Sequence, residues 1–450
     1  MSEDKYIEIN TSCGTFSGNL TESCREFLGI PYAKAERFRY SELIDHYEGV
    51  LNAHHFGNSC PQYRQFFPHL DNPERLFYHR EFREGLKFVY DEDCLNLNIY
   101  TPHNPEKCPV AVYFHGGGFN SGSNSEEPFR GYELAKRGII TVFANYRVGF
   151  LGYLTHEEIQ KEYGHNGNFG LDDMRNALLW VKKHIRDFGG DENNITLFGQ
   201  SAGAMSIQYL CLNHDNDDLF QHVLMMSGAG RFPDFASPRP AEKTQEYWLS
   251  FMDTAGCRNL DELRNLDMYS LAVAVEIMKK RRKDTLYNTM PVIDGYLIRD
   301  SVKNLIESPL KKDYMIGYTN ADMYAPMMAL IGNRFGRASQ AYIYYFDLDA
   351  PGDDNAAFHS SDLRYLFGRL NQSWRPYGAR DYEVSEQMMD YFASFAKTGN
   401  PNHEGSPHWE PCSAKKANVL CFSKDQTAPG KPDLIRMGRN MIEKGNPKAK

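Results

Sequence analysis

The feature that most constrains this chain is a serine flanked by glycines, Gly199-Gln200-Ser201-Ala202-Gly203, between an apolar run and a helix-forming stretch. The run before it, Asn194–Phe198, is short and contains β-branched residues, which is typical of a buried parallel strand. Residues 202–212 after it are rich in small residues and good helix formers. A serine in so tight a strand-to-helix turn is a nucleophile elbow, and the glycines are required because side chains there would strike the strand and the helix. The pattern predicts an α/β protein with Ser201 as its nucleophile.

A second glycine motif follows another apolar run. Residues 110–114 read as a strand, and His115-Gly116-Gly117-Gly118-Phe119 comes directly after it. Successive glycines leave backbone N–H groups uncovered, and in this kind of serine hydrolase such groups bind the oxyanion of the tetrahedral intermediate. We interpret His115 as a residue that fixes this loop, not as the catalytic base. The predicted oxyanion donors are the N–H groups of Gly117, Gly118 and Ala202.

The base is expected after the acid, which itself follows the serine, since this fold uses the order serine, carboxylate, histidine. His359 follows a strand predicted over residues 341–346 and a polar loop, so the loop can carry its imidazole over the elbow. His222 is expected at the start of a strand, away from the catalytic face. His403 and His408 lie in a Pro/Gly-rich stretch typical of a surface loop. The predicted base is therefore His359.

Asp322 is the predicted acid. It follows the strand expected over residues 314–318, at the carboxyl end, where catalytic groups collect in open α/β sheets. Three other carboxylates are weaker candidates. Asp362 would lie on its own helix next to the histidine, Asp294 is typical of a turn, and Glu307 is expected on a solvated helix.

Ordered motifs along the chain, from Gly14 to Trp409, resemble those of the type-B carboxylesterase family, which has the α/β-hydrolase fold. These motifs are Phe27–Ala33, Glu92–Tyr100, Asn145–Arg147, Gly167–Asp173 and Phe188–Asp191. The resemblance implies one domain over residues 1–450, with a central, mostly parallel twisted sheet and helices on both faces. It implies the same triad, Ser201, Asp322 and His359. It also implies that Ser227 hydrogen-bonds around the acid and base, and that Arg147 and Asp173 form a buried structural ion pair.

The sequence departs from the family pattern at four places. Gln200 precedes the nucleophile where the family usually has glutamate, so one negative charge is missing beside the serine. The acid is Asp322 where glutamate is more usual, so its backbone must come closer to His359. Residues 323–342 are too few for the helical insertion of the family, which predicts a reduced lid. The segment Cys60–Cys94 lacks the tryptophan that binds a quaternary ammonium group in cholinesterases.

These departures predict a pocket for neutral esters. The short segment after the acid carries methionines, whose flexible and polarizable side chains adapt to different shapes. Without the glutamate charge beside the serine and without the tryptophan ring, the pocket lacks the features that would select a cation. We expect broad acceptance of aryl and alkyl esters and poor hydrolysis of choline esters. The predicted lining comprises Phe119, Met323, Tyr324 and Met327.

The predicted reaction is hydrolysis of a small-molecule carboxylic ester through an acyl-enzyme intermediate. The same acyl chemistry would serve an amidase or a thioesterase, and both stay open as alternatives. A non-catalytic adhesion-type relative is disfavoured, because such relatives lose the serine or the histidine and this chain has both Ser201 and His359.

Composition and charge restrict the partners and the location. A formal net charge of −9 gives no support for nucleic-acid binding, and the basic run over residues 279–283 is typical of a solvated helix end. Residues 1–5 lack the apolar core of a signal peptide, and no stretch approaches the roughly 18 apolar residues of a membrane span. We therefore expect a cytoplasmic protein that does not bind membranes.

Cysteine usage indicates neither a metal nor a full set of disulfides. Nine cysteines cannot all pair, and no Cys/His cluster has metal-ligand spacing, so we expect no metal and no cofactor. The family resemblance implies a disulfide between Cys60 and Cys94. A reducing cytosol would keep both as thiols.

Overall fold

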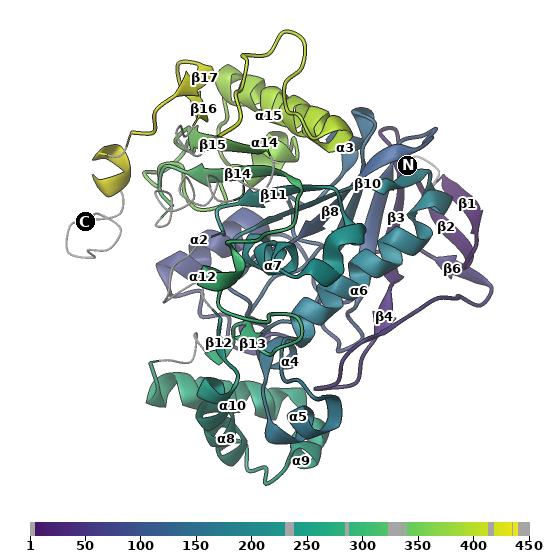
Figure 1. Cartoon of the computed structure of the whole chain (residues 1–450), viewed down its shortest axis with the longest axis vertical. Helices are drawn as coiled ribbons and strands as arrows, with labels where there is room; N and C mark the ends of the chain where they lie inside the picture. Colours follow the sequence, from purple (N-terminus) through teal and green to yellow (C-terminus); the bar gives the residue numbers. More distant parts are fainter. Residues whose placement is uncertain are drawn as a thin grey trace.

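The computed structural model describes residues 5–229, 238–283, 288–322, 335, 340–412, 418–433 and 435–439. A twisted sheet runs through the middle of the molecule (Figure 1). Its strands are β1 Tyr6–Thr11, β2 Gly14–Leu20, β3 Arg25–Pro31, β6 Val50–Asn52, β7 Asn96–Thr101, β8 Cys108–Phe114, β9 Ile140–Ala144, β10 Gly190–Gln200, β11 His222–Met226, β14 Asp313–Thr319, β15 Ala341–Asp347, β16 Val419–Ser423 and β17 Thr427–Gly430. Two short pairs lie outside it, β4 Ala33–Lys34 with β5 Glu42–Leu43, and β12 Arg239–Pro240 with β13 Val292–Ile293.

The strand order is β1-β2-β3-β7-β9-β8-β10-β11-β14-β15-β16-β17, with β6 beside β2. From β9 to β16 every neighbouring pair is parallel, and the strands at both ends of the order pair antiparallel. Alternate residues of the central strands face opposite cores: Val112 and Leu197 point to one, Tyr113 and Phe198 to the other. Both faces are buried, which is why these strands read as continuous apolar runs. The predicted α/β class with a mostly parallel sheet is confirmed.

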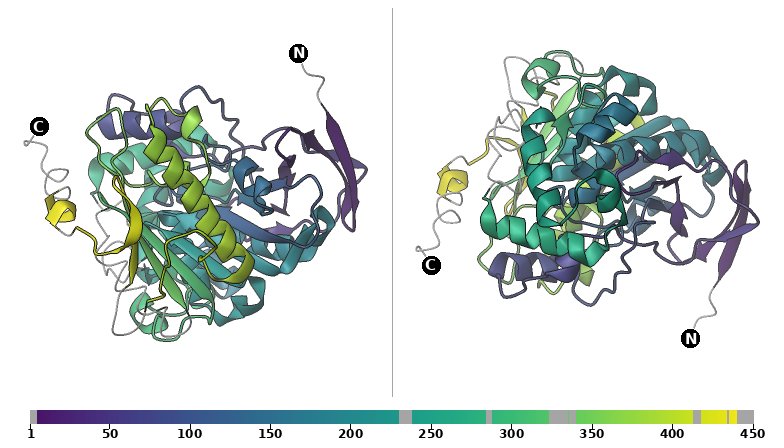
Figure 2. Two further views of the ribbon diagram at one scale, coloured as in Figure 1. Left: turned by 90° about the horizontal axis from the view of Figure 1, so that it is seen from above. Right: turned by 90° about the horizontal axis from the view of Figure 1, so that it is seen from below.

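Helices cover both faces of the sheet. The helices are α1 Tyr63–Phe66, α2 Pro73–Phe82, α3 Tyr132–Lys136, α4 Gly149–Tyr153, α5 Glu157–Tyr163, α6 Phe169–His184, α7 Ala202–Cys211, α8 Glu242–Thr254, α9 Leu260–Asn265, α10 Met268–Arg281, α12 Val302–Leu305, α14 Leu363–Leu366 and α15 Ala379–Thr398. Short 3₁₀ helices span Ile185–Phe188, His214–Leu219 and Leu370–Gln372. Helices α6 and α7 belong to one core and α3, α14 and α15 to the other. Figure 2 shows α15 crossing its face of the sheet.

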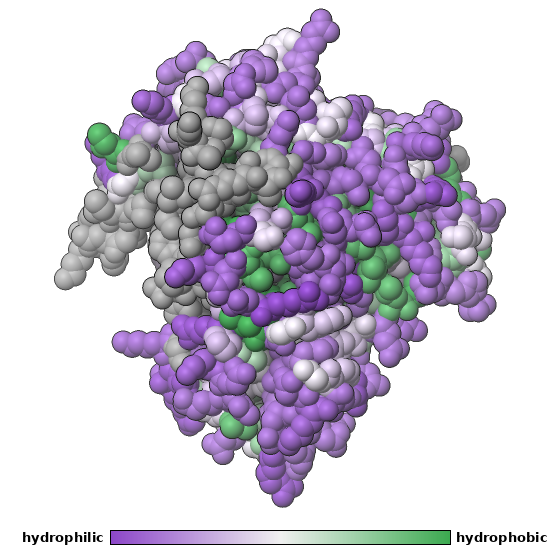
Figure 3. Space-filling model, in the orientation of Figure 1, coloured by the Kyte–Doolittle hydropathy of each residue, from purple (hydrophilic) through white to green (hydrophobic). Residues whose placement is uncertain are grey.

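Helices α8, α9 and α10 form a smaller layer below the sheet in the view of Figure 1. Their apolar residues, such as Trp248, Phe251 and Leu271, join the same core as α6. The basic run ends α10, with Lys280 and Arg281 exposed, as a solvated helix end should be. Figure 3 shows a largely hydrophilic face, with apolar residues gathered between this layer and the sheet. In the described part of the chain, no helix combines the length and apolar character that crossing a membrane requires.

Candidate active site

Ser201 lies at the turn between β10 and α7, in the middle of the parallel strands. Its backbone has φ 56° and ψ −124°, a left-handed conformation that costs free energy in a residue with a side chain. The surroundings hold it there. Its N–H donates to the carbonyl of Met226 on β11 at 2.9 Å, and its own carbonyl accepts from Met205 at 2.9 Å to start the helix. The strand, turn and helix predicted around this serine are confirmed.

The flanking glycines are required by the close approach of β8. A Cβ on Gly203 would lie 2.1 Å from the carbonyl oxygen of Phe114, and a Cβ on Gly199 would lie 2.8 Å from the same atom. Phe114 ends β8, where the glycine loop begins. The two glycine motifs of the sequence therefore meet at one point.

His359 and Asp322 form a hydrogen-bonded pair. His359 Nδ1 lies 2.5 Å from Asp322 Oδ1. The other carboxylate oxygen accepts from the Thr319 N–H at 2.9 Å and from the Ser227 hydroxyl. Burial raises the pKa of Asp322, but the charge on His359 and these hydrogen bonds more than offset it and hold the pKa below its ordinary value. Asp322 is therefore ionised at neutral pH, and the imidazole carries its hydrogen on Nδ1.

The loops that carry the acid and the base are joined through their backbones. The Ala321 N–H donates to the carbonyl of Ala357 at 3.2 Å, and the Ala357 N–H donates to Asn320 Oδ1 at 3.2 Å. Aspartate is one methylene shorter than glutamate, so the two loops must lie close for Asp322 to reach the ring. The close approach expected from the shorter acid is present.

The ring of His359 reaches the elbow through Gln200. His359 Nε2 lies 3.1 Å from Gln200 Nε2, and Gln200 is the last residue of β10, with 4% of its surface exposed. The structure thus brings together the nucleophile's turn, the predicted base and the predicted acid. In the sequence Gln200 shows only as a missing charge, because no local pattern signals a pairing across 159 residues.

The glycine loop lies directly against the nucleophile, since a Cβ on Gly116 would be 2.9 Å from Ser201 Cβ. Gly117 and Gly118 have φ 118° and 60°, which glycine adopts without strain. Within the described residues neither of their N–H groups donates to another group. Ala202 is the first residue of α7, so its N–H has no acceptor inside the helix. All three predicted oxyanion donors can receive a ligand oxygen.

His115 supports this loop, as interpreted from the sequence. It is buried, its Nδ1 lies 2.8 Å from the Gly116 carbonyl oxygen, and its ring stacks on Tyr146 with centroids 4.3 Å apart. Burial lowers the pKa of His115 to about 4, so it stays neutral. A neutral ring held on both sides orients the loop.

The other candidates occupy structural positions. His222 begins β11 and contacts Asp313 at 3.0 Å, and Asp294 accepts from two N–H groups of its own turn. Glu307 is exposed, just beyond α12 and not on it. Asp362 is the N-cap residue of α14 and does not lie within a helix, contrary to the expectation from the sequence. It is buried and accepts from a tyrosine hydroxyl, and burial raises its pKa to about 7.

The predicted pocket lining is only partly described. Met323, Tyr324 and Met327 lie outside the described residues. Phe119 is completely buried and packs edge to face on Tyr153, with centroids 5.4 Å apart. Its role in the pocket stays a prediction, and this burial favours a packing role.

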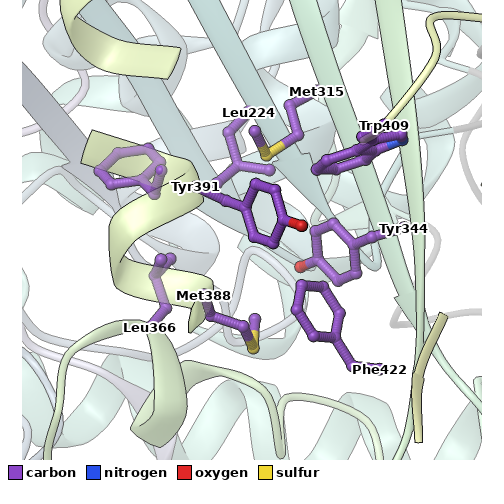
Figure 4. Close-up of a pocket in the computed structure, with 9 residues that line it drawn as sticks. Leu224, Met315, Tyr344, Leu366, Met388, Tyr391, Trp409 and Phe422 are labelled. Carbon is purple, nitrogen blue, oxygen red and sulfur yellow. The ribbon is translucent and has the colours of Figure 1, made fainter. Parts of the chain in front are cut away.

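A cavity with a volume of about 10 Å³ lies between the sheet and α15. Figure 4 shows the aromatic and aliphatic side chains that line it. The hydroxyl of Tyr344, which lines it, donates to Asp362 at 2.7 Å. A space of this size holds at most one water molecule. The cavity is therefore a gap in the core that contains α3, α14 and α15, and not a substrate site.

One part of the surroundings was not foreseen from the sequence. Phe77 of α2 packs edge to face on Phe358, the residue before His359, with centroids 4.9 Å apart. On the same helix, buried Glu81 contacts the guanidinium of Arg375 at 3.0 Å, and Arg375 also binds Asp353 at 2.9 Å. The segment between Cys60 and Cys94 thus supports the loop of the base.

Three further expectations concern structural residues. Arg147 and Asp173 form a buried ion pair at 2.8 Å, as the resemblance implied. All nine cysteines are free, including Cys60 and Cys94. Within the described ranges, no three His, Cys, Asp or Glu side chains gather in a way that could hold a metal ion.

Comparisons with known proteins identify the family and the fold. A family model described as "Carboxylesterase family" matches residues 5–327 and 321–441. The chain is 26% identical over 505 residues to the para-nitrobenzyl esterase of Bacillus subtilis (strain 168), covering 97% of this chain and 99% of that protein. It is 27% identical over 538 residues to the bile salt-activated lipase of Rattus norvegicus, covering 97% and 83%. A solved structure of a PNB esterase has the same fold, with a TM-score of 0.82 at 24% identity over 97% of this chain and 99% of that one.

Proposed function

The chain belongs to the carboxylesterase family and hydrolyses carboxylic esters, and we propose that Ser201, His359 and Asp322 carry out this reaction through an acyl-enzyme. The observation that supports the proposal is the 2.5 Å contact between Asp322 and His359, whose ring reaches the serine's turn. A nucleophile, a base and an ionised orienting group are the parts that acyl transfer to serine needs.

In the proposed reaction, Ser201 Oγ attacks the carbonyl carbon of the ester while His359 Nε2 takes its proton. The proton then passes to the leaving alcohol, and the acyl group stays on Ser201. Asp322 holds the Nδ1 hydrogen and stabilises the imidazolium. The N–H groups of Gly117, Gly118 and Ala202 bind the oxyanion, and loss of one such donor costs about 10²–10³ in rate in comparable enzymes. Water repeats the cycle on the acyl-enzyme.

Covalent labelling tests the nucleophile. An organophosphonate should label Ser201 and inactivate the enzyme, and Ser201→Ala should abolish both labelling and turnover. Two nearby serines serve as controls, because the Ser206 hydroxyl donates to the Ala202 carbonyl at 2.9 Å and the Ser227 hydroxyl donates to Asp322. A label on Ser206 or Ser227 would contradict the proposal.

For the substrate, we propose neutral esters with aryl or alkyl groups. Gln200 puts no charge beside the nucleophile. Rings of the Cys60–Cys94 segment already hold the protein's own cations: Lys279 Nζ lies 3.4 Å from the ring centre of Tyr63, and the Arg83 guanidinium lies 3.7 Å from that of Phe88. These ring faces are therefore not free for a quaternary ammonium group. One relative is named a para-nitrobenzyl esterase, which fits this class.

A substrate panel tests this choice. The value of kcat/KM should be higher for a neutral aryl or alkyl ester than for a choline ester of the same acyl group. Equal or higher values for the choline ester would contradict the pocket proposal and leave the triad untouched. An amide and a thioester of that acyl group complete the panel, and faster cleavage of either would favour the amidase or thioesterase alternative.

We also propose that residues 1–450 act as one domain in the cytoplasm. One core draws on residues from Cys13 to Met437, which supports a single domain. The thiols of Cys60 and Cys94 are free and buried, which fits a reducing compartment. For a single domain we expect one cooperative unfolding transition. For a cytoplasmic protein we expect recovery in the cytosolic fraction, with all nine thiols titratable after unfolding.

A further inference from the structure

Both ring nitrogens of His359 are engaged by specific groups. Nδ1 lies 2.5 Å from Asp322, and Nε2 lies 3.1 Å from the amide nitrogen of Gln200. In a neutral imidazole one nitrogen donates a hydrogen bond and the other accepts one. Because the ionised carboxylate can only accept, Nδ1 must carry the hydrogen. Nε2 is then the acceptor, and the Gln200 amide is its donor.

We propose that Gln200 is a positioning residue that donates to His359 Nε2 and so holds the imidazole neutral and close to the nucleophile. The inference rests on the proposed triad. An amide N–H donates to the neutral ring but not to the protonated ring, which has a hydrogen on both nitrogens. Protonation of His359 therefore costs the Gln200 hydrogen bond, and the base stays neutral at lower pH than it would without this contact.

The side chain of Gln200 is confined on both sides. It is buried, and a Cβ on Gly116 would lie 2.8 Å from Gln200 Oε1, so the amide is held between the glycine loop and the ring. The lone pair that accepts from Gln200 is also the one that must take the proton of Ser201. The amide must therefore release Nε2 when the serine attacks, so Gln200 acts on the resting enzyme.

Any test must separate the effect of Gln200 on the pKa of His359 from the effects of the charged groups around the ring. Two carboxyl groups, those of Asp322 and Asp362, interact electrostatically with His359. From α2, Tyr78 faces Asp322, and burial raises its pKa, so it stays uncharged. Burial raises the pKa of Asp362 to about 7, within the pH range in which a histidine titrates. A pH profile must therefore be measured with and without Asp362.

The experiment compares two substitutions of similar length. Gln200→Met removes the donor, and Gln200→Glu keeps the shape but brings a carboxylate, which favours the protonated ring. The pH dependence of kcat/KM for a neutral aryl ester should show an acidic limb whose midpoint rises in Gln200→Met. It should rise further in Gln200→Glu, by about one pH unit or more above the wild type, as for an opposite charge within a few ångströms. Both shifts should persist in an Asp362→Asn background.

The outcomes separate this inference from the proposed function. An unchanged midpoint in a folded Gln200→Met protein, or a lower one in Gln200→Glu, would overturn the role of Gln200. If Gln200→Met does not fold, the isosteric Gln200→Glu decides alone. His359→Ala tests the triad independently, because near-wild-type turnover in this variant would refute the triad. If His359→Ala loses turnover but the acidic limb of the Gln200 variants is unshifted, only the positioning role of Gln200 is refuted.

Discussion

Replacement of Gly203 by alanine tests the packing of the elbow against the end of β8. Gly203 is the second residue of α7, where alanine would otherwise favour the helix by roughly 1 kcal/mol. The added Cβ would lie 2.1 Å from the Phe114 carbonyl oxygen, and real Cβ contacts essentially never fall below 3.0 Å. The helix start must therefore move by about 0.9 Å, a displacement that can cost on the order of 100-fold in rate. That loss corresponds to about 2.7 kcal/mol of barrier.

The assay is kcat/KM for a neutral aryl ester, with the melting temperature measured on the same samples. Gly199→Ala places its Cβ 2.8 Å from the same oxygen, so its loss should be smaller than that of Gly203→Ala. Gly438 is also helical, and among the described residues no atom lies within 4 Å of where its Cβ would be, so Gly438→Ala should leave the rate unchanged. A Gly203→Ala enzyme that keeps more than about a tenth of wild-type kcat/KM, or the reverse order of the two elbow variants, would refute the reasoning.

Further predictions concern the acid, the base and the ion pair of α2. Asp322→Asn should lower kcat by about 10⁴ at neutral pH, because an amide can stabilise the wrong tautomer of the imidazole; near-native turnover would move the acid elsewhere. Because the pKa of Asp322 is lower in the folded protein, its ionised carboxylate stabilises the fold at pH values above the unfolded pKa of about 3.9, and this stabilisation is lost as the pH falls through the folded pKa. The difference in stability between wild type and Asp322→Asn should therefore vanish in acid. Urea titrations at several pH values measure it. His359→Ala should remove nearly all turnover while the melting temperature stays close to wild type. Glu81→Gln should lower the free energy of unfolding by about 1–3 kcal/mol, because it weakens one of the two carboxylate contacts of buried Arg375 while Asp353 remains, and an unchanged urea midpoint would contradict that role.

The elbow could be predicted from the sequence because its requirements are local. A tight turn from strand to helix admits only glycine at 199 and 203, and the structure places both against one carbonyl oxygen of β8. The apolar runs that become β8, β10 and β14 are continuous because both faces of these strands are buried. The order of acid and base also follows the order of strands along the chain. Local steric requirements and burial restrict which residue types occur at neighbouring positions, so they can be read from the sequence.

Other features depend on where distant segments meet. Gln200 reads in the sequence as a lost charge, and its amide contacts a ring 159 residues away. The support of the His359 loop by Phe77 and Glu81 is equally remote, since α2 precedes that loop by about 280 residues. Burial of Phe119 depends on Tyr153 and could not be inferred from its place in the glycine loop. Side-chain contacts of this kind are decided by the packing of the sheet and its helices, because one residue's type and neighbours do not encode which distant surface it will face.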